Sequence, residues 1–308
     1  MQTETFEVQR EQEGERLDRY LSTVYPDFSR SFIQKLIKNQ QVSVNDKCQK
    51  ASYPIRENDL VSIIIPDAVE TAILPEDLPL DILYEDEDVL IVNKPKGMVV
   101  HPSAGHSSGT LVNAVMYHCK DSLSGINGEI RPGIVHRIDM DTTGSLIVCK
   151  NDEAHLNIAE QIKNHTVNRI YEGIVYGNVK EEEGTVEGAI GRHPTDRKKM
   201  AINVKNGKPA ITHYKVLKHF KDYTYMQFKL ETGRTHQIRV HMASIGHPLL
   251  GDTLYAGNGK HSRFKNLQGQ TLHAKTIGFI HPRTGQYMEF SAPLPDYFIR
   301  LLDLLKSN

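Results

Sequence analysis

Residues 133–150, GIVHRIDMDTTGSLIVCK, hold the densest group of side chains that could do chemistry. Asp139 stands in a polar turn beside His136 and Arg137, just before an apolar stretch that predicts a strand. A sheet can hold a carboxylate rigidly at such an edge, where it could act as a nucleophile or a base. Composition alone favours an ordinary turn, in which a carboxylate accepts backbone N–H groups. Asp141 fits that turn role better than Asp139, because it directly precedes Thr-Thr-Gly.

A second segment, residues 230–257, concentrates basic side chains at the start of a predicted helix. Its first turn presents Arg234, His236 and Arg239, which are donors suited to a carboxylate or a phosphate. Ordinary surface and capping cations are the other interpretation, and these residues alone do not decide between the two. The helix itself is predicted from apolar residues at helical spacing and from the residues that end it: Ile238, Met242, Ile245, Gly246 and Pro248.

The elements that must position these segments alternate between strands and helices from residue 83 onward. Period-two patterns predominate, and Met226, Phe228 and Leu230 are expected on one strand face. We therefore expect an α+β fold with a mixed, largely antiparallel sheet flanked by helices and loops. Strands are predicted at 88–93, 145–150, 169–177, 224–232 and 286–294, and helices at 110–119, 153–164 and 235–246.

Residues 1–68 are predicted to form a small N-terminal α/β domain. Helices are expected at 16–24 and 29–40, a tight turn at Asn45-Asp46, and a strand at 60–65. The second helix has an apolar face and a basic face, the latter carrying Arg30, Lys35 and Lys38.

Residues 69–82 are predicted to be an extended linker to a catalytic domain at 83–308, because they contain prolines and acids but no basic residue. The net charge of −1 arises from 37 basic and 38 acidic residues. Basic runs at 29–50 and 192–221 are separated by an acidic run at 67–88. This distribution favours a polyanionic partner over solvated loops, which are the alternative.

The composition, with 39% apolar and 24% charged residues in 308, predicts about two globular domains. No apolar run approaches the ~18 residues of a membrane span, and the start is too polar for a signal peptide, so a cytoplasmic protein is expected. Three scattered cysteines, Cys48, Cys119 and Cys149, argue against a disulfide framework or a thiolate zinc site. We expect all three to be buried apolar residues. No H-E-x-x-H motif occurs, so no metal site is predicted.

Taken together, the motifs of residues 83–300 resemble those of the RluA/RluD family of pseudouridine synthases. The family's His-Arg-Leu-Asp and Thr-Ser-Gly appear as residues 136–139 and 142–144, with Ile138 for Leu and Thr143 for Ser. Further matches are VNKPKGMVVHPSAGH, RIYEGIVYG with Arg169 in place of Lys, TGRTHQIRVHMASIGHPLLGD, and LHAKTIGFIHP with FSAPLP. GERLDRYL and SRSFIQKLIKNQQVSVN resemble the RNA-binding domain named after small-subunit ribosomal protein S-four.

The resemblance implies isomerisation of uridine to pseudouridine in RNA, with large-subunit ribosomal RNA as the expected substrate. Asp139 would be the nucleophile or base, and Arg239 would pair with it and keep it charged. Tyr171 would stack on the flipped uracil and take part in proton removal. Arg137 would enter the RNA stack that the base has left. RNA contacts are also expected from His136, Arg30, Lys35 and Lys38. No cofactor or metal is expected, and the protein is expected to act as a monomer.

Two other functions are open to this sequence. Gly105–Gly109 is a G-x-S-x-G, followed by Asp139 and His236 in hydrolase order, which would make Ser107 a hydrolase nucleophile. That motif needs an apolar strand running into the serine, whereas a proline and a polar loop precede Ser107. The other alternative is a catalytically inactive RNA-binding protein, but binding alone does not need the carboxylate of Asp139. The sequence leaves open which bond Asp139 attacks and which uridines are modified.

Overall fold

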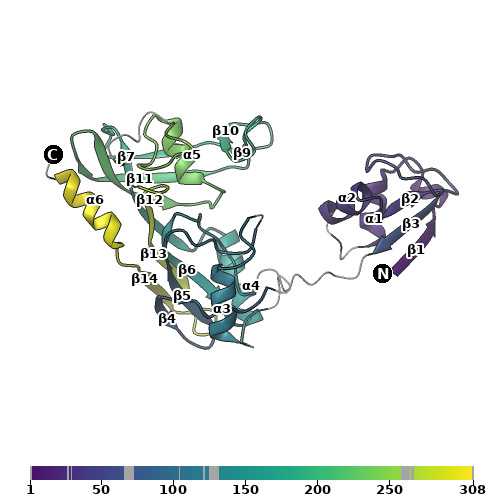
Figure 1. Cartoon of the computed structure of the whole chain (residues 1–308), viewed down its shortest axis with the longest axis horizontal. Helices are drawn as coiled ribbons and strands as arrows, with labels where there is room; N and C mark the ends of the chain where they lie inside the picture. Colours follow the sequence, from purple (N-terminus) through teal and green to yellow (C-terminus); the bar gives the residue numbers. More distant parts are fainter. Residues whose placement is uncertain are drawn as a thin grey trace. The chain divides into compact units, whose positions relative to one another are not determined.

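The chain divides into two compact units, Met1–Thr71 and Ala72–Asn308 (Figure 1). Residues 69–72 of the predicted linker lie outside the described residues, and residues 73–81 form no helix or strand. This segment is attached to the second unit, because Asn113 Nδ2 donates to the Leu74 carbonyl at 2.8 Å. The computed structural model describes residues 2–25, 28, 30–65, 73–103, 105–120, 122–124, 132–257, 264 and 267–306.

The N-terminal unit packs two helices against a three-stranded antiparallel sheet. Its apolar core joins Leu17 and Leu21 of the first helix to Ile33 and Leu36 of the second. The predicted turn is present, since Asn45 and Asp46 both have positive φ. The elements are β1 (Gln2–Glu7), η1 (Arg10–Gln12), α1 (Leu17–Val24), α2 (Arg30–Lys38), β2 (Val42–Val44) and β3 (Leu60–Ile65).

The second unit is built around one nine-stranded sheet. β6 and β13 are parallel and the other neighbouring strands are antiparallel, as the sequence predicts. The spatial order is β4 (Ile82–Glu85), β5 (Val89–Lys94), β6 (Thr143–Cys149), β13 (Leu272–Ile280), β7 (Asn168–Tyr176), β12 (Tyr223–Leu230), β11 (Ile211–His219) and β8 (Glu183–Glu187). β14 (Tyr287–Ser291) pairs with β13, and β9 (Ile190–Arg192) and β10 (Met200–Ile202) form a separate hairpin.

Helices cover both faces of β5 and β6, which explains why these strands read as continuous apolar runs. Successive residues of β5 point to opposite faces. Leu90 and Val92 lie in the cluster that contains α3 (Leu111–Cys119). Val89 lies in the cluster that contains α4 (Asp152–Lys163).

The other half of the sheet is covered in the same way by α5 (Gln237–Ser244) and α6 (Asp296–Lys306). Tyr171 of β7 shares a cluster with Ile238 of α5, whereas Ile174 of β7 packs with Phe298 of α6. In Figure 1, α6 is the yellow C-terminal helix beside β7 and β12. The cluster of α5 also contains α3 residues, so the two helices lie on the same side of the sheet.

The structure differs from the sequence-based expectations in its number of elements and in one cysteine. The elements that the patterns above do not indicate include β1, β4, β8, β9, β10, β11 and α6. Cys119 and Cys149 are buried as predicted, but Cys48 is exposed, so the expectation for that residue is wrong. Among the described residues, no helix is both long and apolar enough to span a bilayer.

Candidate active site

A cavity of about 490 Å³ lies where the loop before β6, strand β7, and the loop and first turn of α5 meet. Asp139 is the acidic residue of its lining, and Tyr171 contributes the phenol. The size falls in the range of cavities that hold small ligands. The basic lining residues are Arg137, Lys163, Arg169, Arg234 and Arg239, accompanied by His136, His165 and His236.

The carboxylate of Asp139 is held by Arg239 across a separation of 100 residues in sequence. Arg239 Nη1 donates to Asp139 Oδ2 at 2.9 Å. The side chain of Asp139 keeps 21% exposure, so it still reaches the cavity. The turn is closed by the backbone, since Thr142 N–H donates to the Asp139 carbonyl at 3.1 Å. The predicted pair is therefore formed, and a carboxylate oxygen faces the cavity with its charge balanced by a guanidinium.

Arg239 is itself fixed by Asp252, a fully buried residue that sequence reasoning did not single out. Arg239 Nε and Nη2 donate to the two oxygens of Asp252 at 2.7 and 3.0 Å. Asp252 Oδ1 also accepts the N–H groups of Leu254 and Tyr255. Burial opposes the charge of Arg239, but its hydrogen bonds to Asp252 and Asp139 raise its pKa. The guanidinium is thus a fixed cation between two carboxylates.

His236 approaches the other oxygen of Asp139, with Nε2 at 3.9 Å from Oδ1. It precedes α5 with a φ of 57°, a left-handed conformation that is uncommon outside glycine. Tyr255 OH accepts from Met200 N at 2.8 Å and forms a hydrogen bond with His236 Nδ1, also at 2.8 Å. This bond fixes the orientation of the His236 ring beside Asp139. Burial lowers the pKa of His236, which favours the neutral ring.

Tyr171 lies on β7 and is 8% exposed. Burial raises the pKa of Tyr171, Arg169 opposes that shift, and the charge of Asp139 adds to it. The phenol is protonated at neutral pH. A role in proton removal would first require loss of that proton, whereas stacking and hydrogen-bond donation are available at once.

The neighbours Arg137 and His136 have different environments. Arg137 is exposed, with Nη1 at 3.4 Å from His101 Nε2. His136 Nε2 instead accepts the N–H of Ile147 in β6 at 3.0 Å. Burial lowers the pKa of His136 to about 3, so the ring is neutral. The position of Arg137 suits an RNA contact, whereas His136 uses its Nε2 to fix the loop to the sheet.

The loop of Asp139 is anchored from below by Lys94, a lysine that is 1% exposed. Its Nζ donates to the carbonyls of Pro95, Met98 and Met140 at 2.8, 2.7 and 2.9 Å. Three donated bonds tie the Asn-Lys-Pro-Lys-Gly turn to the residue after Asp139. Gly144 completes the anchor, because its φ of 108° and its contact with the β13 backbone leave no room for a Cβ.

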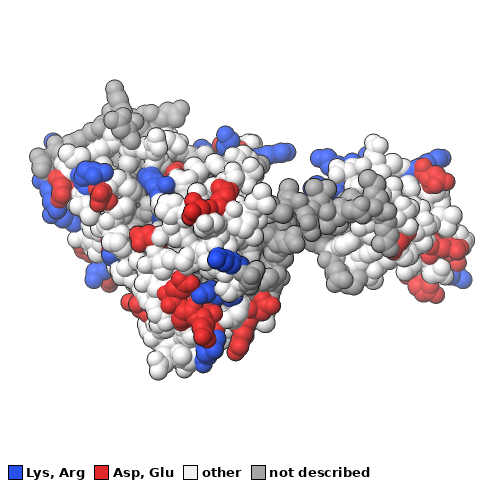
Figure 2. Space-filling model, turned by 60° about the horizontal axis from the view of Figure 1, so that its bottom comes forward, with Lys and Arg blue, Asp and Glu red and all other residues white. Residues whose placement is uncertain are grey.

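The predicted RNA-binding residues of the N-terminal unit are of two kinds. Arg30 donates to Asp18 Oδ2 at 3.0 Å, and the side chain of Asp18 is fully buried. Lys35 and Lys38 are exposed on the face of α2 opposite Ile33. On the face of this unit that Figure 2 shows, acidic side chains gather at the lower right and a basic group lies at the upper left. The two lysines are thus available to a ligand, and Arg30, whose side chain is 53% exposed, is also paired with Asp18.

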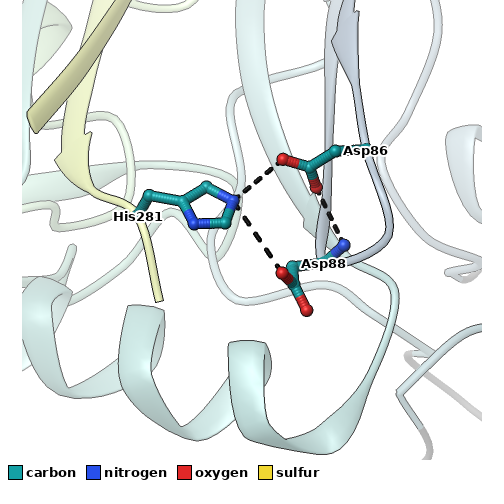
Figure 3. A group of neighbouring side chains, drawn as sticks. All are labelled: Asp86, Asp88 and His281. Atoms are coloured by element: carbon teal, nitrogen blue, oxygen red, sulfur yellow. Dashed lines mark hydrogen bonds and ion pairs between the residues drawn. The ribbon is translucent and has the colours of Figure 1, made fainter. Parts of the chain in front are cut away.

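A second cluster of acidic and basic side chains lies outside the cavity, between the turns after β4 and β13 (Figure 3). Its atoms have the spacing of a metal site, but they are already used. His281 Nε2 donates to Asp86 Oδ2 at 2.8 Å, because His281 Nδ1 accepts backbone N–H groups. Asp88 receives two bonds from Arg283, each of 2.7 Å. We interpret the cluster as a structural clamp between two turns.

Ser107 lies elsewhere. It is exposed in the loop between β5 and α3 and does not line the cavity of Asp139 and His236. Strand β5 ends at Lys94, so no strand runs into the serine. The geometry gives no support to the hydrolase alternative.

Comparison with known proteins agrees with the geometry. The family model described as RNA pseudouridylate synthase matches residues 88–244, and the S4 domain model matches residues 15–61. An uncharacterized RNA pseudouridine synthase of Bacillus subtilis (strain 168), YlyB, is 50% identical, over 97% of this chain and 96% of the relative. Ribosomal large subunit pseudouridine synthase D of Escherichia coli (strain K12) is 40% identical, over 99% and 94%.

Among solved structures, human RNA pseudouridylate synthase domain containing 1 matches with a TM-score of 0.57 and 25% identity. The match covers 80% of this chain and 98% of the human chain. Fold and sequence therefore point the same way. The chain belongs to the RNA pseudouridine synthase family and carries an S4 domain ahead of its catalytic unit.

Proposed function

We propose that the protein converts specific uridines of large-subunit ribosomal RNA to pseudouridine, with Asp139 as the catalytic carboxylate. The observation that carries this proposal is the Asp252–Arg239–Asp139 chain of ion pairs, which ends in a carboxylate at the cavity. The relatives named ribosomal large subunit pseudouridine synthase D support the choice of RNA.

The chemistry requires that the C1′–N1 bond breaks, that uracil turns, and that a C1′–C5 bond forms, with a proton leaving C5 and one reaching N1. An ionised carboxylate can divide the bond cleavage into easier steps, either as a nucleophile or as a base. Arg239 holds Asp139 in place, so the carboxylate is oriented before substrate arrives. The side chains that line the cavity keep the detached uracil in place until it rejoins the sugar.

Access to the uridine requires base flipping, at a cost of a few kcal/mol. The Arg137 guanidinium is exposed two residues before Asp139, where it can replace the missing base by stacking. The protonated Tyr171 ring lines the cavity as a face for the flipped uracil. In this proposal Arg137 stabilises the RNA stack that the base has left, and Tyr171 stabilises the flipped base.

The S4 domain supplies RNA binding away from the flipped base in this proposal. The exposed Lys35 and Lys38 bind phosphates, which sequence-independent contacts require. We further propose that the enzyme acts in the cytoplasm as a monomer and without a metal.

The test uses unmodified large-subunit ribosomal RNA made by transcription. Carbodiimide-dependent stops of reverse transcription map any pseudouridine that the protein forms. Wild type should give new stops at specific uridines, and Asp139→Asn should give none while still binding the RNA. Absence of stops with wild type on both free transcript and purified subunits contradicts the proposal. Ester hydrolysis that disappears in Ser107→Ala would favour the hydrolase alternative.

A further inference from the structure

Arg169 is a buried cation with no carboxylate partner among the described residues. It is 6% exposed and lines the cavity. Its Nη2 donates to the Glu231 carbonyl at 3.2 Å, whereas Nε makes no hydrogen bond. A guanidinium in such a position is costly, because a buried charge without a counter-charge loses its solvation and gains little in return. Arg239, in the same cavity, has two carboxylates.

The protein is shaped around this side chain. Arg169 lies two residues before Tyr171 on β7, so both point to the same face of the sheet. A Cβ at Gly233 would lie 2.6 Å from Arg169 Nη1, so glycine at that position leaves room for the guanidinium. Both Gly233 and Arg169 line the cavity. The guanidinium is thus seated at the wall beside the place proposed for the uracil.

The surroundings of Arg169 call for an anion rather than a neutral group. Arg234 and Lys163 line the same cavity, and the acidic Asp139 is already paired with Arg239. Burial lowers the pKa of Arg169, and Arg234 adds to that shift through like-charge repulsion. A neutral carbonyl would fill a hydrogen bond but leave the excess positive charge. A phosphodiester would supply both the acceptor and the charge.

We propose that Arg169, together with Arg234, binds a phosphodiester of the RNA next to the target uridine. The identity of the ligand rests on the proposed function, since RNA is the polyanion that the site would receive. The subsite holds the nucleotide by its backbone while the glycosidic bond is broken, which keeps the sugar beside Asp139 when the base turns. In the free protein Arg169 has no counter-charge among the described residues, and the phosphodiester of bound RNA supplies one.

The experiment uses the full chain and a synthetic uridine-containing hairpin of large-subunit ribosomal RNA, chosen without reference to activity. Binding is measured by fluorescence anisotropy at several salt concentrations for wild type, Arg169→Gln, Arg169→Lys and Arg300→Gln. Arg300 is a matched control, because it is an exposed arginine of the same unit that does not line the cavity. We expect Arg169→Gln to bind about tenfold more weakly. Its log–log salt slope should be shallower by about 0.7–0.9. Lysine should restore the slope, and Arg300→Gln should match wild type.

A methylphosphonate scan then identifies the phosphate. Neutralising one phosphate next to the target should weaken wild type but not Arg169→Gln, because the variant has already lost that contact. Equal effects of every methylphosphonate on both proteins would overturn the phosphate subsite, and would assign any affinity loss to contact with the base. An unchanged salt slope would overturn it as well.

Folding and the proposed function are separated by two further readouts. The thermal midpoint of free Arg169→Gln should be unchanged or higher, because an unpaired buried charge is removed. A lower midpoint with an unchanged slope would assign Arg169 to structure and overturn the subsite. If wild type binds with an Arg169-dependent slope but forms no pseudouridine, the proposed function fails while the subsite stands.

Discussion

Two clusters of the catalytic unit are built from the same side-chain types but differ in whether their carboxylates are fully hydrogen-bonded. The first joins Asp139, Arg239 and Asp252, and the second joins Asp88 and Arg283 with their neighbours Asp86 and His281. In the second cluster, each carboxylate is met by a guanidinium, an imidazole or backbone N–H groups. In the first, Asp252 is enclosed but Asp139 retains an oxygen toward a cavity.

The comparison teaches that residue type does not separate a clamp from a reactive site. The difference lies in whether a carboxylate oxygen remains free to bind a ligand. A fully satisfied carboxylate stabilises the fold, whereas one that is held on one side and open on the other can act on a ligand. Arg239 links the two carboxylates: the buried Asp252 fixes the guanidinium, and the guanidinium in turn orients Asp139.

The largest expected effect comes from Asp139→Asn. Pseudouridine formation should fall by about 10³-fold or more, because the amide cannot serve as nucleophile or base. Stability should change little, since Arg239 keeps Asp252 as a counter-charge. Single-turnover rates and thermal unfolding measure the two quantities. Asp88→Asn is the matched control, and equal loss of activity in both variants would remove the distinction between the clusters.

Asp252→Asn should affect both activity and stability. We expect the rate constant to fall about 10–100-fold with little change in RNA affinity, because Arg239 would lose its fixed orientation. Removal of one partner from a buried ion pair should also lower the free energy of unfolding by about 3 kcal/mol. A purely structural role predicts the stability loss without the change in single-turnover rate at a temperature where the variant is folded.

Asp88→Asn should act on stability alone. We expect a loss of about 2 kcal/mol in the free energy of unfolding, because Asp88 is buried and receives charged hydrogen bonds from Arg283. Pseudouridine formation at a temperature where the variant is folded should equal that of wild type. Chemical denaturation and the mapping assay provide the measurements, and a selective loss of activity would contradict the clamp.

The clamp also predicts a pH dependence. Hydrogen bonds from Arg283 lower the pKa of Asp88 to about 2. Its contribution to stability is therefore complete above the ordinary Asp pKa of about 3.9 and is lost as the pH falls toward 2. The stability difference between wild type and Asp88→Asn should shrink over that window, as measured by urea denaturation at successive pH values. A difference that stays constant from neutral pH down to pH 2 would contradict the assignment.

The smallest effect should come from the N-terminal unit, where the same contrast recurs. Changing Lys35 and Lys38 together to Ala should weaken RNA binding and make the log–log salt slope shallower by about 1–2. The thermal midpoint should stay unchanged, because both lysines are exposed. Arg30→Ala should instead lower it, since Asp18 would lose a partner in a buried site. Unchanged salt slope and catalysis in the double variant would contradict phosphate binding by α2.

Local patterns were sufficient for most elements of the fold. The apolar runs of β5 and β6, the alternation of β12 and the apolar face of α2 correspond to what those elements bury. β1 was missed because its residues, QTETFE, carry little apolar signal and pair with β3 more than fifty residues away. α6, which packs on β7 and β12, was missed although Phe298, Leu301 and Leu305 stand at helical spacing, so a local signal for this helix was present in the sequence.

The site shows the same limit. Motif resemblance selected Asp139, Tyr171 and Arg239, and the structure brings all three to one cavity. It gave no role to Asp252, although this residue ends the quoted motif TGRTHQIRVHMASIGHPLLGD, and none to Tyr255; these two residues act through Arg239 and His236 rather than on the cavity. It also grouped His136 with Arg137, although the two side chains point to different partners.

The sequence by itself indicated many of the helices and strands, the motifs at their ends and the family that the chain resembles. These depend on spacing along the chain, where side-chain periodicity and turn residues act over a few positions. The tertiary structure alone decided which charges are paired and which are left open. Ion pairs such as Arg239 with Asp139 join residues that are far apart in sequence, and burial sets how costly an unpaired charge such as Arg169 becomes.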